Sequence, residues 1–171
     1  MKSKLIILIL ILTSLLSGCS TPMKYQNSMF NNTFFANKVI YFSLTQQSDK
    51  VRIVKNGPNR GETKTPDNRD VFKKSIENLA LETKLNLKYT ENKLFAAENE
   101  IIVTVDITDL KWMFNFSSAK MVSSLKYDVK NGKNYNIIGI HKNNSGGTKE
   151  WNLYNSLKNA NYLFLKELEK N

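Results

Sequence analysis

The chain contains few side chains that could form a catalytic centre. Its 171 residues include one cysteine, Cys19, and one histidine, His141. A serine hydrolase triad would have to use His141, but no Gly-x-Ser-x-Gly turn is present to hold the serine. A metal site with two histidine ligands is excluded, and so is a zinc cluster of several cysteines. Acid–base chemistry would therefore fall to carboxylates.

Two pairs of acidic residues are close in sequence, Glu98 with Glu100 and Asp106 with Asp109. A pair of carboxylates can support hydrolysis, as it does in glycosidases. Residues two apart on a strand also share a face. Acids beside lysines on a protein surface are nevertheless the ordinary case. We therefore expect no enzymatic activity, no metal and no cofactor.

The cysteine follows an N-terminal apolar run. Lys2 and Lys4 precede an apolar run that extends from Leu5 to Leu16. The small residues Ser17 and Gly18 follow the run and are directly followed by Cys19. At ~1.5 Å per residue, a helix over this run spans roughly 18 Å, which is too short for a hydrocarbon core of about 30 Å. No Ala-x-Ala site is near, so an ordinary secretory signal is not indicated either.

This arrangement resembles the signal of bacterial lipoproteins, over residues 1 to about 22. The resemblance implies that a peptidase removes the signal peptide, that the Cys19 thiol carries a diacylglyceryl group, and that the new amine is acylated. Two or more acyl chains anchor a protein stably. Because Ser20 stands where Asp is the usual inner-membrane retention signal, the resemblance favours the outer membrane, facing the periplasm. In a host with one membrane, it favours the cell surface.

The length of the chain predicts one folded domain after the leader. Residues 1–18 are expected to be the signal peptide, residues 19–37 a lipidated N-terminus and tether, and residues 38–171 a single α+β domain. A domain of this size can bury a substantial core. The tether region is rich in Asn, Ser and Thr, although its phenylalanines suggest that its end docks on the domain.

The expected mature chain is strongly basic. Of 25 basic side chains two belong to the leader, which leaves 23 against 15 acidic ones and a formal charge of +8. In an envelope, such a charge favours anionic partners such as phosphorylated glycolipids, lipid headgroups and the carboxylates of peptidoglycan. A nucleic acid is not an expected partner there.

The positive charge is concentrated between Lys50 and Lys74, and every arginine of the chain lies in this segment. Arginine binds phosphate and carboxylate oxygens in a bidentate manner. The candidate anion-binding residues are Arg52, Lys55, Arg60, Lys64 and Arg69. A solvated loop followed by a basic first helical turn is the alternative interpretation.

A cluster of large apolar side chains follows Asp109. It consists of Trp112, Met113, Phe114 and Phe116. One interpretation is an exposed patch that contacts lipid or a partner protein. The other is a loop that folds over its own core, because aromatic side chains contribute much of the apolar area that cores bury.

Periodicity predicts an α+β fold, with two helices packed on one face of a small antiparallel or mixed sheet of about four strands. The expected strands cover residues 38–45, 101–108, 121–129 and 135–141, the last two joined by a turn at Asn131-Gly132. The expected helices run from an Asp67 or Asn68 cap to residue 85, and over 150–169 after a Thr148 cap. Residues 50–54 either pair with the first strand or continue it.

One short segment and one residue do not follow the periodicity of the expected helices and strands. Residues 94–97 are expected to pack on the core after a turn. Asn161 falls in the apolar stripe of the last helix, together with Trp151, Tyr154 and Leu157. It either binds a carbonyl at the end of a strand or lies at the margin of the stripe.

The body resembles small α+β envelope lipoproteins, including the lipoprotein of the lipopolysaccharide-assembly translocon and the auxiliary lipoproteins of lipid transport. It also resembles uncharacterised proteobacterial lipoproteins, through Leu94-Phe95-Ala96, a strand followed by Asp109-Leu110 and aromatics, and Ala160-Asn161. Those proteins tend to carry arginines before the Ala-Asn pair, where this chain has Leu157 and Lys158. No role of those arginines is transferred.

The sequence thus favours a non-catalytic, membrane-anchored envelope lipoprotein. It would be an accessory or binding subunit of an outer-membrane assembly or transport system, or a binder of an anionic envelope component. The alternative is a periplasmic inhibitor or immunity lipoprotein that acts against a cell-wall hydrolase or a toxin, since basic loops and exposed aromatics also suit an acidic cleft.

Overall fold

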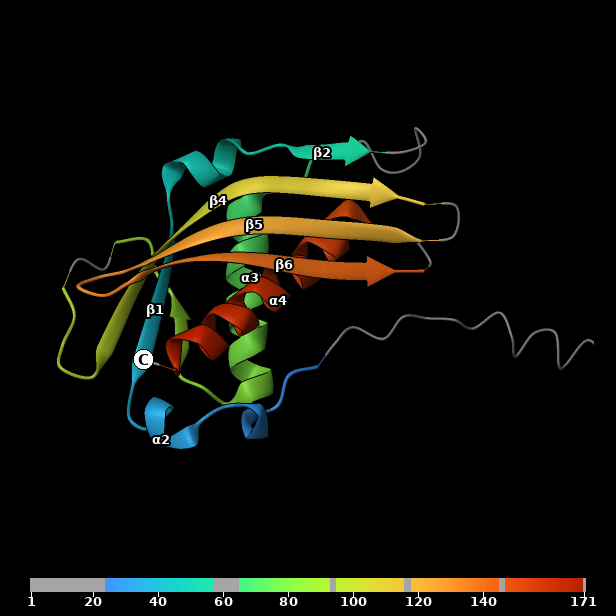
Figure 1. The fold of residues 1–171 in the computed structure, drawn as a ribbon. Coiled ribbons are helices and arrows are strands. Elements are labelled where there is room, and N and C mark those ends of the chain that lie inside the picture. The colour runs from blue at the N-terminus through green and yellow to red at the C-terminus, as the bar shows by residue number, and fades with distance from the viewer. Residues whose placement is uncertain (1–23, 57–64, 93–94, 116–117, 145–146, 171) are drawn as a thin grey trace, which may run out of the picture.

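The computed structural model describes residues 24–56, 65–92, 95–115, 118–144 and 147–170. The helices and strands follow one another along the chain (Figure 1). In order they are η1 Asn27–Met29, α2 Asn32–Phe35, β1 Val39–Leu44, η2 Gln46–Lys50, β2 Ile53–Asn56, α3 Asn68–Thr83, β3 Leu87–Tyr89, β4 Glu100–Phe114, β5 Ala119–Val129, β6 Asn134–Asn143 and α4 Lys149–Leu168.

The strands form one mixed sheet in the order β3-β1-β4-β5-β6, and β2 also pairs with β4. β4, β5 and β6 are antiparallel neighbours, as expected, and Asn131 has the positive φ of 60° that the turn between β5 and β6 requires. β1 runs parallel to β3 and β4, and β2 runs parallel to β4. The α+β class is confirmed, but the sheet has six strands rather than about four.

The extra strands follow from the length of β4. Its 15 residues exceed the expected strand, so β1 pairs with its first part and β2 with its last part. Residues 50–54 therefore neither pair with β1 nor continue it. β3 has only three residues, and it adds to the free edge of β1.

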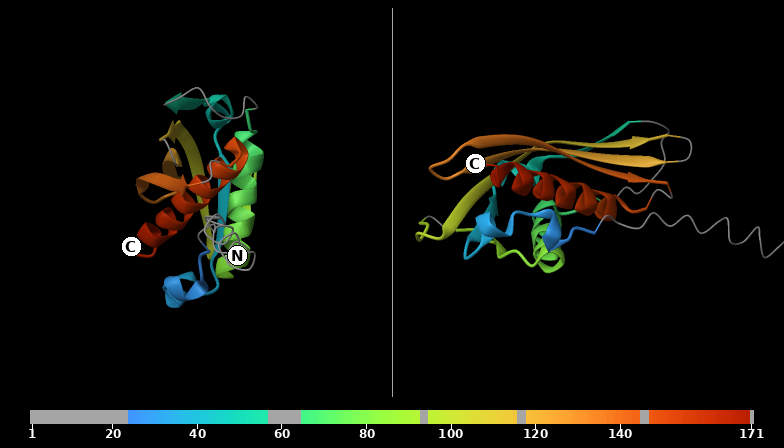
Figure 2. Two further views of the ribbon diagram at one scale, coloured as in Figure 1. Left: turned by 90° about the vertical axis from the view of Figure 1, so that its right-hand side faces the viewer. Right: turned by 60° about the horizontal axis from the view of Figure 1, so that its bottom comes forward.

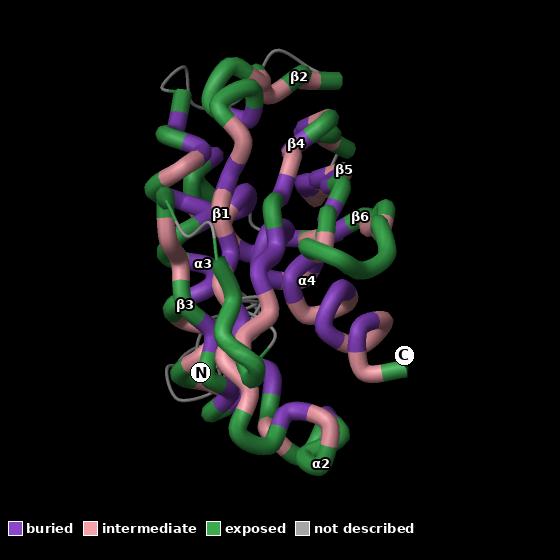
Figure 3. The backbone as a smooth tube through the Cα atoms, turned by 90° about the vertical axis from the view of Figure 1, so that its left-hand side faces the viewer, coloured by how far each residue is buried: buried purple, intermediate pink, exposed green. Residues whose placement is uncertain are grey.

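Both long helices lie behind the sheet in the view of Figure 1, and Figure 2 shows the same arrangement from two other directions. α4 packs along β5 and β6, whereas α3 packs against α4 and β3. Buried positions concentrate where β1, β4 and the helices meet (Figure 3). The face of β4, β5 and β6 that points away from α4 is called the outer face below.

The expected helix caps are confirmed. The Asp67 side chain accepts hydrogen bonds from the backbone N–H groups of Arg69 and Asp70 at the start of α3. Thr148 accepts one from the N–H of Trp151 at the start of α4. Each cap satisfies amides that have no partner within their helix, which fixes where the helix begins.

Asn161 has a different role from either of the two expected. Its Oδ1 accepts a hydrogen bond from the Tyr127 hydroxyl of β5 at 2.8 Å, and its Nδ2 donates to Ser75 Oγ of α3 at 3.0 Å. All three residues are buried. The amide therefore joins α4 to a strand and to the neighbouring helix. Burial raises the pKa of Tyr127 well above its ordinary value, so its hydroxyl is a donor at neutral pH.

Three expectations about packing are wrong. Phe95 is 82% exposed and does not join the core. Trp151 and Tyr154 are half-buried rather than central, because Leu153 and Leu157 take the inward positions of α4. Residues 109–114 belong to β4 rather than to a loop.

None of the helices in the described part of the chain is both long enough and apolar enough to span a bilayer.

Candidate functional site

Four of the site residues proposed from the sequence lie outside the described residues, as do the expected signal peptide and Leu94. The four site residues are Cys19, Arg60, Lys64 and Phe116.

The described members of the basic segment do not gather into one site. Arg52 is exposed on the chain between η2 and β2. Lys55 is half-buried in β2, with its Nζ 5.7 Å from the centre of the Trp112 ring. Arg69 contacts Asp49 through Nη2 at 2.7 Å and donates a hydrogen bond to the Tyr89 hydroxyl at 2.9 Å. The Arg69 guanidinium is therefore bound within the protein.

The apolar cluster after Asp109 is divided between the two faces of the sheet. Trp112 is 1% exposed and contacts Phe114 on the face that packs on the helices, with ring centres 4.5 Å apart. Met113 points to the outer face and is 37% exposed. The alternation of β4 continues through this segment, although consecutive apolar letters conceal it in the sequence. The expectation of a folded loop is therefore wrong.

The acidic pairs are engaged with neighbouring groups. Asp106 accepts a hydrogen bond from the Thr45 hydroxyl at 2.6 Å, and Asp109 lies 2.6 Å from Lys111 Nζ. Glu100 accepts one from the backbone N–H of Ala97 at 2.8 Å.

His141 lies in β6 against α4, and its ring meets the ring of Trp151 edge to face at 4.7 Å. Its Nε2 is buried without a hydrogen-bond partner among the described residues. Burial, and to a lesser extent the charge of Lys158, lower the pKa of His141. The imidazole is therefore neutral at pH 7. Lys158 is itself buried and paired with Glu82 at 2.8 Å.

The first described residues are fixed to the body. Tyr25 donates its backbone N–H to Glu82 at 3.1 Å, stacks on Tyr162 with ring centres 4.2 Å apart, and accepts a hydrogen bond from Asn159 at 3.0 Å. The expected tether thus docks on the body from about residue 25.

The same segment continues across the end of α3. Asn27 donates to the carbonyl oxygen of Thr83 at 2.6 Å. The backbone N–H of Asn31 donates to Glu169 at 2.7 Å. These bonds hold η1 and α2 beside the C-terminal ends of both long helices.

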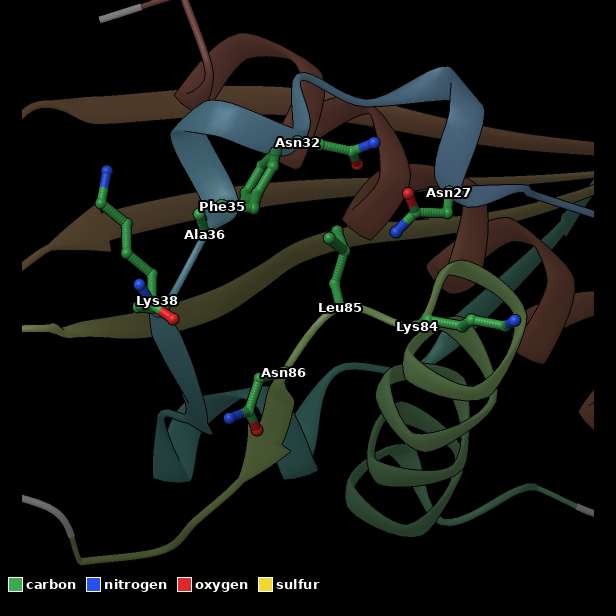
Figure 4. A pocket seen from close by; sticks show the side chains of 9 residues that line it. Asn27, Asn32, Phe35, Ala36, Lys38, Lys84, Leu85 and Asn86 are labelled. Carbon is green, nitrogen blue, oxygen red and sulfur yellow. The ribbon is translucent and has the colours of Figure 1, made fainter.

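A pocket of about 380 Å³ lies between this segment and the chain that leads from α3 to β3. Figure 4 shows the Asn27, Asn32, Phe35 and Leu85 side chains gathered around one space, while the Nζ ends of Lys38 and Lys84 point outward at its edge. The residues that line it are Asn27, Asn32, Phe35, Ala36, Asn37, Lys38, Lys84, Leu85 and Asn86.

Two residues with left-handed backbone shape this pocket, Asn37 with φ 61° and Lys84 with φ 58°. Asparagine tolerates this conformation, but lysine adopts it less readily. Lys84 caps α3, and its N–H bonds to the carbonyl of Ala80 at 2.8 Å. Glycine is the usual residue at such a cap, so Lys84 lines the pocket at a conformational cost, and its ammonium group lies at the edge of the pocket.

The pocket is polar and positively charged. Among the described residues that line it, none is acidic. Lys38 Nζ lies 3.6 Å from the centre of the Phe34 ring, and Lys84 forms no ion pair with the described residues. Ammonium groups and asparagine amides donate hydrogen bonds to carboxylate or phosphate oxygens, and the amides also accept from hydroxyls. The C-terminal carbonyls of α3 disfavour an anion, but Asn27 and the Lys84 N–H already occupy two of them.

The sequence did not indicate this site, because its residues come from two segments far apart in the chain, 27–38 and 84–86. The run of asparagines from Asn27 to Asn37 was the available signal, but asparagine is also typical of loops and tethers. Only the contacts of the folded chain bring this run to Lys84 and Asn86.

No protein-family model matches the chain, and no curated protein matches it. Solved structures show a distant similarity. An uncharacterised protein superposes with a TM-score of 0.42 at 8% identity, over 78% of this chain and 91% of the other. A Xanthomonas campestris protein from a domain family of unknown function gives 0.41 at 11% identity, over 76% and 80%. A hypothetical protein from Chlamydia trachomatis gives 0.33 at 12% identity, over 78% and 92%.

Proposed function

We propose that the chain is a lipid-anchored protein of the bacterial envelope, attached through Cys19, and that its body binds an anionic envelope component rather than catalysing a reaction. The proposed place is the outer membrane, facing the periplasm, or the cell surface in a host with one membrane. The proposed binding site is the pocket shown in Figure 4. In this role the protein would be a binding or accessory subunit of the envelope.

The observation that supports this function best is the composition of the pocket. The lining consists of four asparagines, two lysines and three apolar residues, Phe35, Ala36 and Leu85, without an acid among the described lining residues. A ligand that suits these groups carries an oxyanion next to hydroxyl or amide groups. A phosphorylated sugar and a peptidoglycan fragment both have this chemistry, the first through phosphate and the second through carboxylate.

The test uses the full-length protein in detergent micelles and measures binding by titration calorimetry. Glucosamine 1-phosphate is the phosphate probe, and a muramyl dipeptide is the carboxylate probe. We expect one of them to bind, and we expect the double variant Lys38→Ala, Lys84→Ala to weaken that binding about tenfold, because two charge-assisted contacts are removed. Which probe binds identifies the source of the oxyanion.

A double variant with the same change of net charge is the control. Lys73 and Lys126 are exposed and do not line the pocket. Lys73→Ala, Lys126→Ala should therefore bind like the wild type, and the affinity of both should fall as salt is raised. Equal weakening by the two double variants, or no binding of either probe by the wild type, would show that the pocket is not the site.

A further inference from the structure

The outer face of the sheet carries exposed apolar side chains at one end. Val54 is 51% exposed, Met113 37%, Ile138 56% and Ile140 46%. These four come from β2, β4 and β6, so they are distant in sequence. An isolated exposed apolar residue is ordinary, but a group on one face marks a surface that meets a partner.

Strand register makes this group continuous. Val54 pairs with Lys111, Lys111 with Val122, and Val122 with Ile140, which gives one row across four strands. The row on one side of it contains Met113, Lys120 and Lys142. The row on its opposite side contains Ser124 and Ile138. The outer-face patch is defined as Val54, Met113, Val122, Ile138, Ile140, Lys111, Lys120 and Lys142.

The charge of the patch indicates the kind of partner. Lys111 is 2.6 Å from Asp109, whereas Lys120 and Lys142 form no ion pair with the described residues. An apolar centre flanked by ammonium groups complements a surface whose outer layer is anionic and whose interior is apolar. A second copy of the chain does not fit, because two basic patches would repel each other.

The position of the anchor selects a membrane as that partner. Tyr25 is fixed to the body and lines a hollow of about 280 Å³ together with Ile140 and Lys142 of the patch-bearing strand. Cys19 precedes Tyr25 by six residues. A fully extended chain of that length reaches only roughly 20 Å. A bilayer that holds acyl chains on Cys19 is therefore close to the β6 edge of the sheet.

We infer that the outer-face patch docks on the anionic bilayer in which the Cys19 acyl chains are embedded. This inference rests on the lipid anchor of the proposed function. The apolar side chains enter the boundary between headgroups and acyl chains, while Lys120 and Lys142 contact the phosphates. The Figure 4 pocket is lined by residues of the α2 segment and of the chain between α3 and β3, and none of its lining residues belongs to the outer-face patch. In the view of Figure 1, α2 lies below β6 rather than on the outer face.

A single fluorescent label tests the docking. Acylation consumes the thiol of Cys19, the only cysteine, so an introduced cysteine is the only reactive thiol of the lipidated chain. Ser124→Cys places a label on the outer face beside Ile138. Leu81→Cys places one on α3, at a residue that is 78% exposed. Both full-length lipidated proteins are reconstituted in vesicles of phosphatidylglycerol and phosphatidylcholine that contain a lipid with a nitroxide headgroup.

We expect the nitroxide to quench the label at position 124 at least about twofold more than the label at position 81. Adding Lys120→Glu and Lys142→Glu to Ser124→Cys should reduce this quenching, whereas adding Lys50→Glu and Lys73→Glu should not, because Lys50 and Lys73 lie outside the patch. Equal quenching at both positions, or stronger quenching at position 81, overturns the docking inference.

A maleimide reaction with the wild-type protein distinguishes a failure of the docking inference from a failure of the proposed lipid anchor. If Cys19 of the purified wild type reacts, its thiol is free, and the proposed lipid anchor fails together with the docking inference. If it does not react and position 124 remains unquenched, the docking inference alone fails. Vesicles of phosphatidylcholine only should give weaker quenching at position 124, because the lysines then lack anionic headgroups.

Discussion

Asn161 is the residue on which three elements converge. Its amide donates to Ser75 of α3 and accepts from Tyr127 of β5, so both of its polar ends have buried partners. A buried polar group without a partner costs about 1–3 kcal/mol. The pair of bonds therefore sets the rotation of α4 against its neighbours, because other rotations would leave the amide unsatisfied.

The pKa of His141 can be measured directly, because His141 is the only histidine of the chain. Burial and the charge of Lys158 lower the pKa of His141 from the ordinary value of 6.5. We expect a nuclear magnetic resonance titration of its imidazole to show a midpoint below 6.5. A midpoint at or above 6.5 would mean that His141 is solvated rather than packed against Trp151.

This pKa also ties stability to pH. The unfolded chain binds a proton at His141 more readily than the folded chain, so folding stability falls as the pH drops from 6.5 through the lower folded pKa. His141→Phe removes this dependence. Its free energy of unfolding should change less between pH 7 and pH 5 than that of the wild type.

At the scale of the elements, β6 packs closely on α4 at Gly139. A Cβ atom added at Gly139 would lie 2.1 Å from the carbonyl oxygen of Ser156 and 2.7 Å from the Cβ of Ala160. Glycine lets the strand approach the helix backbone, and the Ser123 and Ser156 hydroxyls form a hydrogen bond of 2.6 Å beside this point.

Gly139→Ala should therefore destabilise the protein. The methyl group forces β6 away from α4, and overpacking of this kind costs about 1–3 kcal/mol or more. The free energy of unfolding in urea measures this cost. Gly132→Ala is the control, because the added methyl group would meet mainly the Val129 side chain, at 3.0 Å. An equal effect at both glycines would contradict the close seam.

The sequence predicted elements whose signals are local. β5 and β6 alternate regularly, and Asp67 and Thr148 cap their helices as expected. β3 was missed because three residues give no period, and the partner of β2 was missed because parallel pairing with β4 depends on distant residues. The end of β4 was missed because Trp112, Met113 and Phe114 are all apolar.

The candidate site was less predictable than the fold. Neither the pocket nor the outer-face patch has a sequence motif, since each collects residues from separate segments through tertiary contacts. Of the residues proposed from the sequence, Met113 and Lys55 were placed on opposite faces of the sheet. Strand register decided this placement, and register is set by pairing that the sequence does not display.

At the scale of the whole molecule, the proposed anchor at Cys19, the outer-face patch and the pocket can be considered together. The chain leaves Cys19, is fixed at Tyr25 beside β6, and crosses the end of α3 to form a wall of the pocket. The proposed membrane contact lies on the outer face, and the proposed ligand site lies beside α2 and the C-terminal end of α3. A protein built in this way would hold a soluble ligand near the membrane that anchors it.

The lipid on Cys19 is the central claim, and metabolic labelling with a palmitate analogue tests it most directly. The wild type should be labelled, and Ser17→Ala should be labelled as well, because a small residue still precedes the cleavage site. Cys19→Ala should carry no label, since it lacks the thiol that receives the lipid. Labelling of Cys19→Ala to the level of the wild type would contradict the lipid-anchored account.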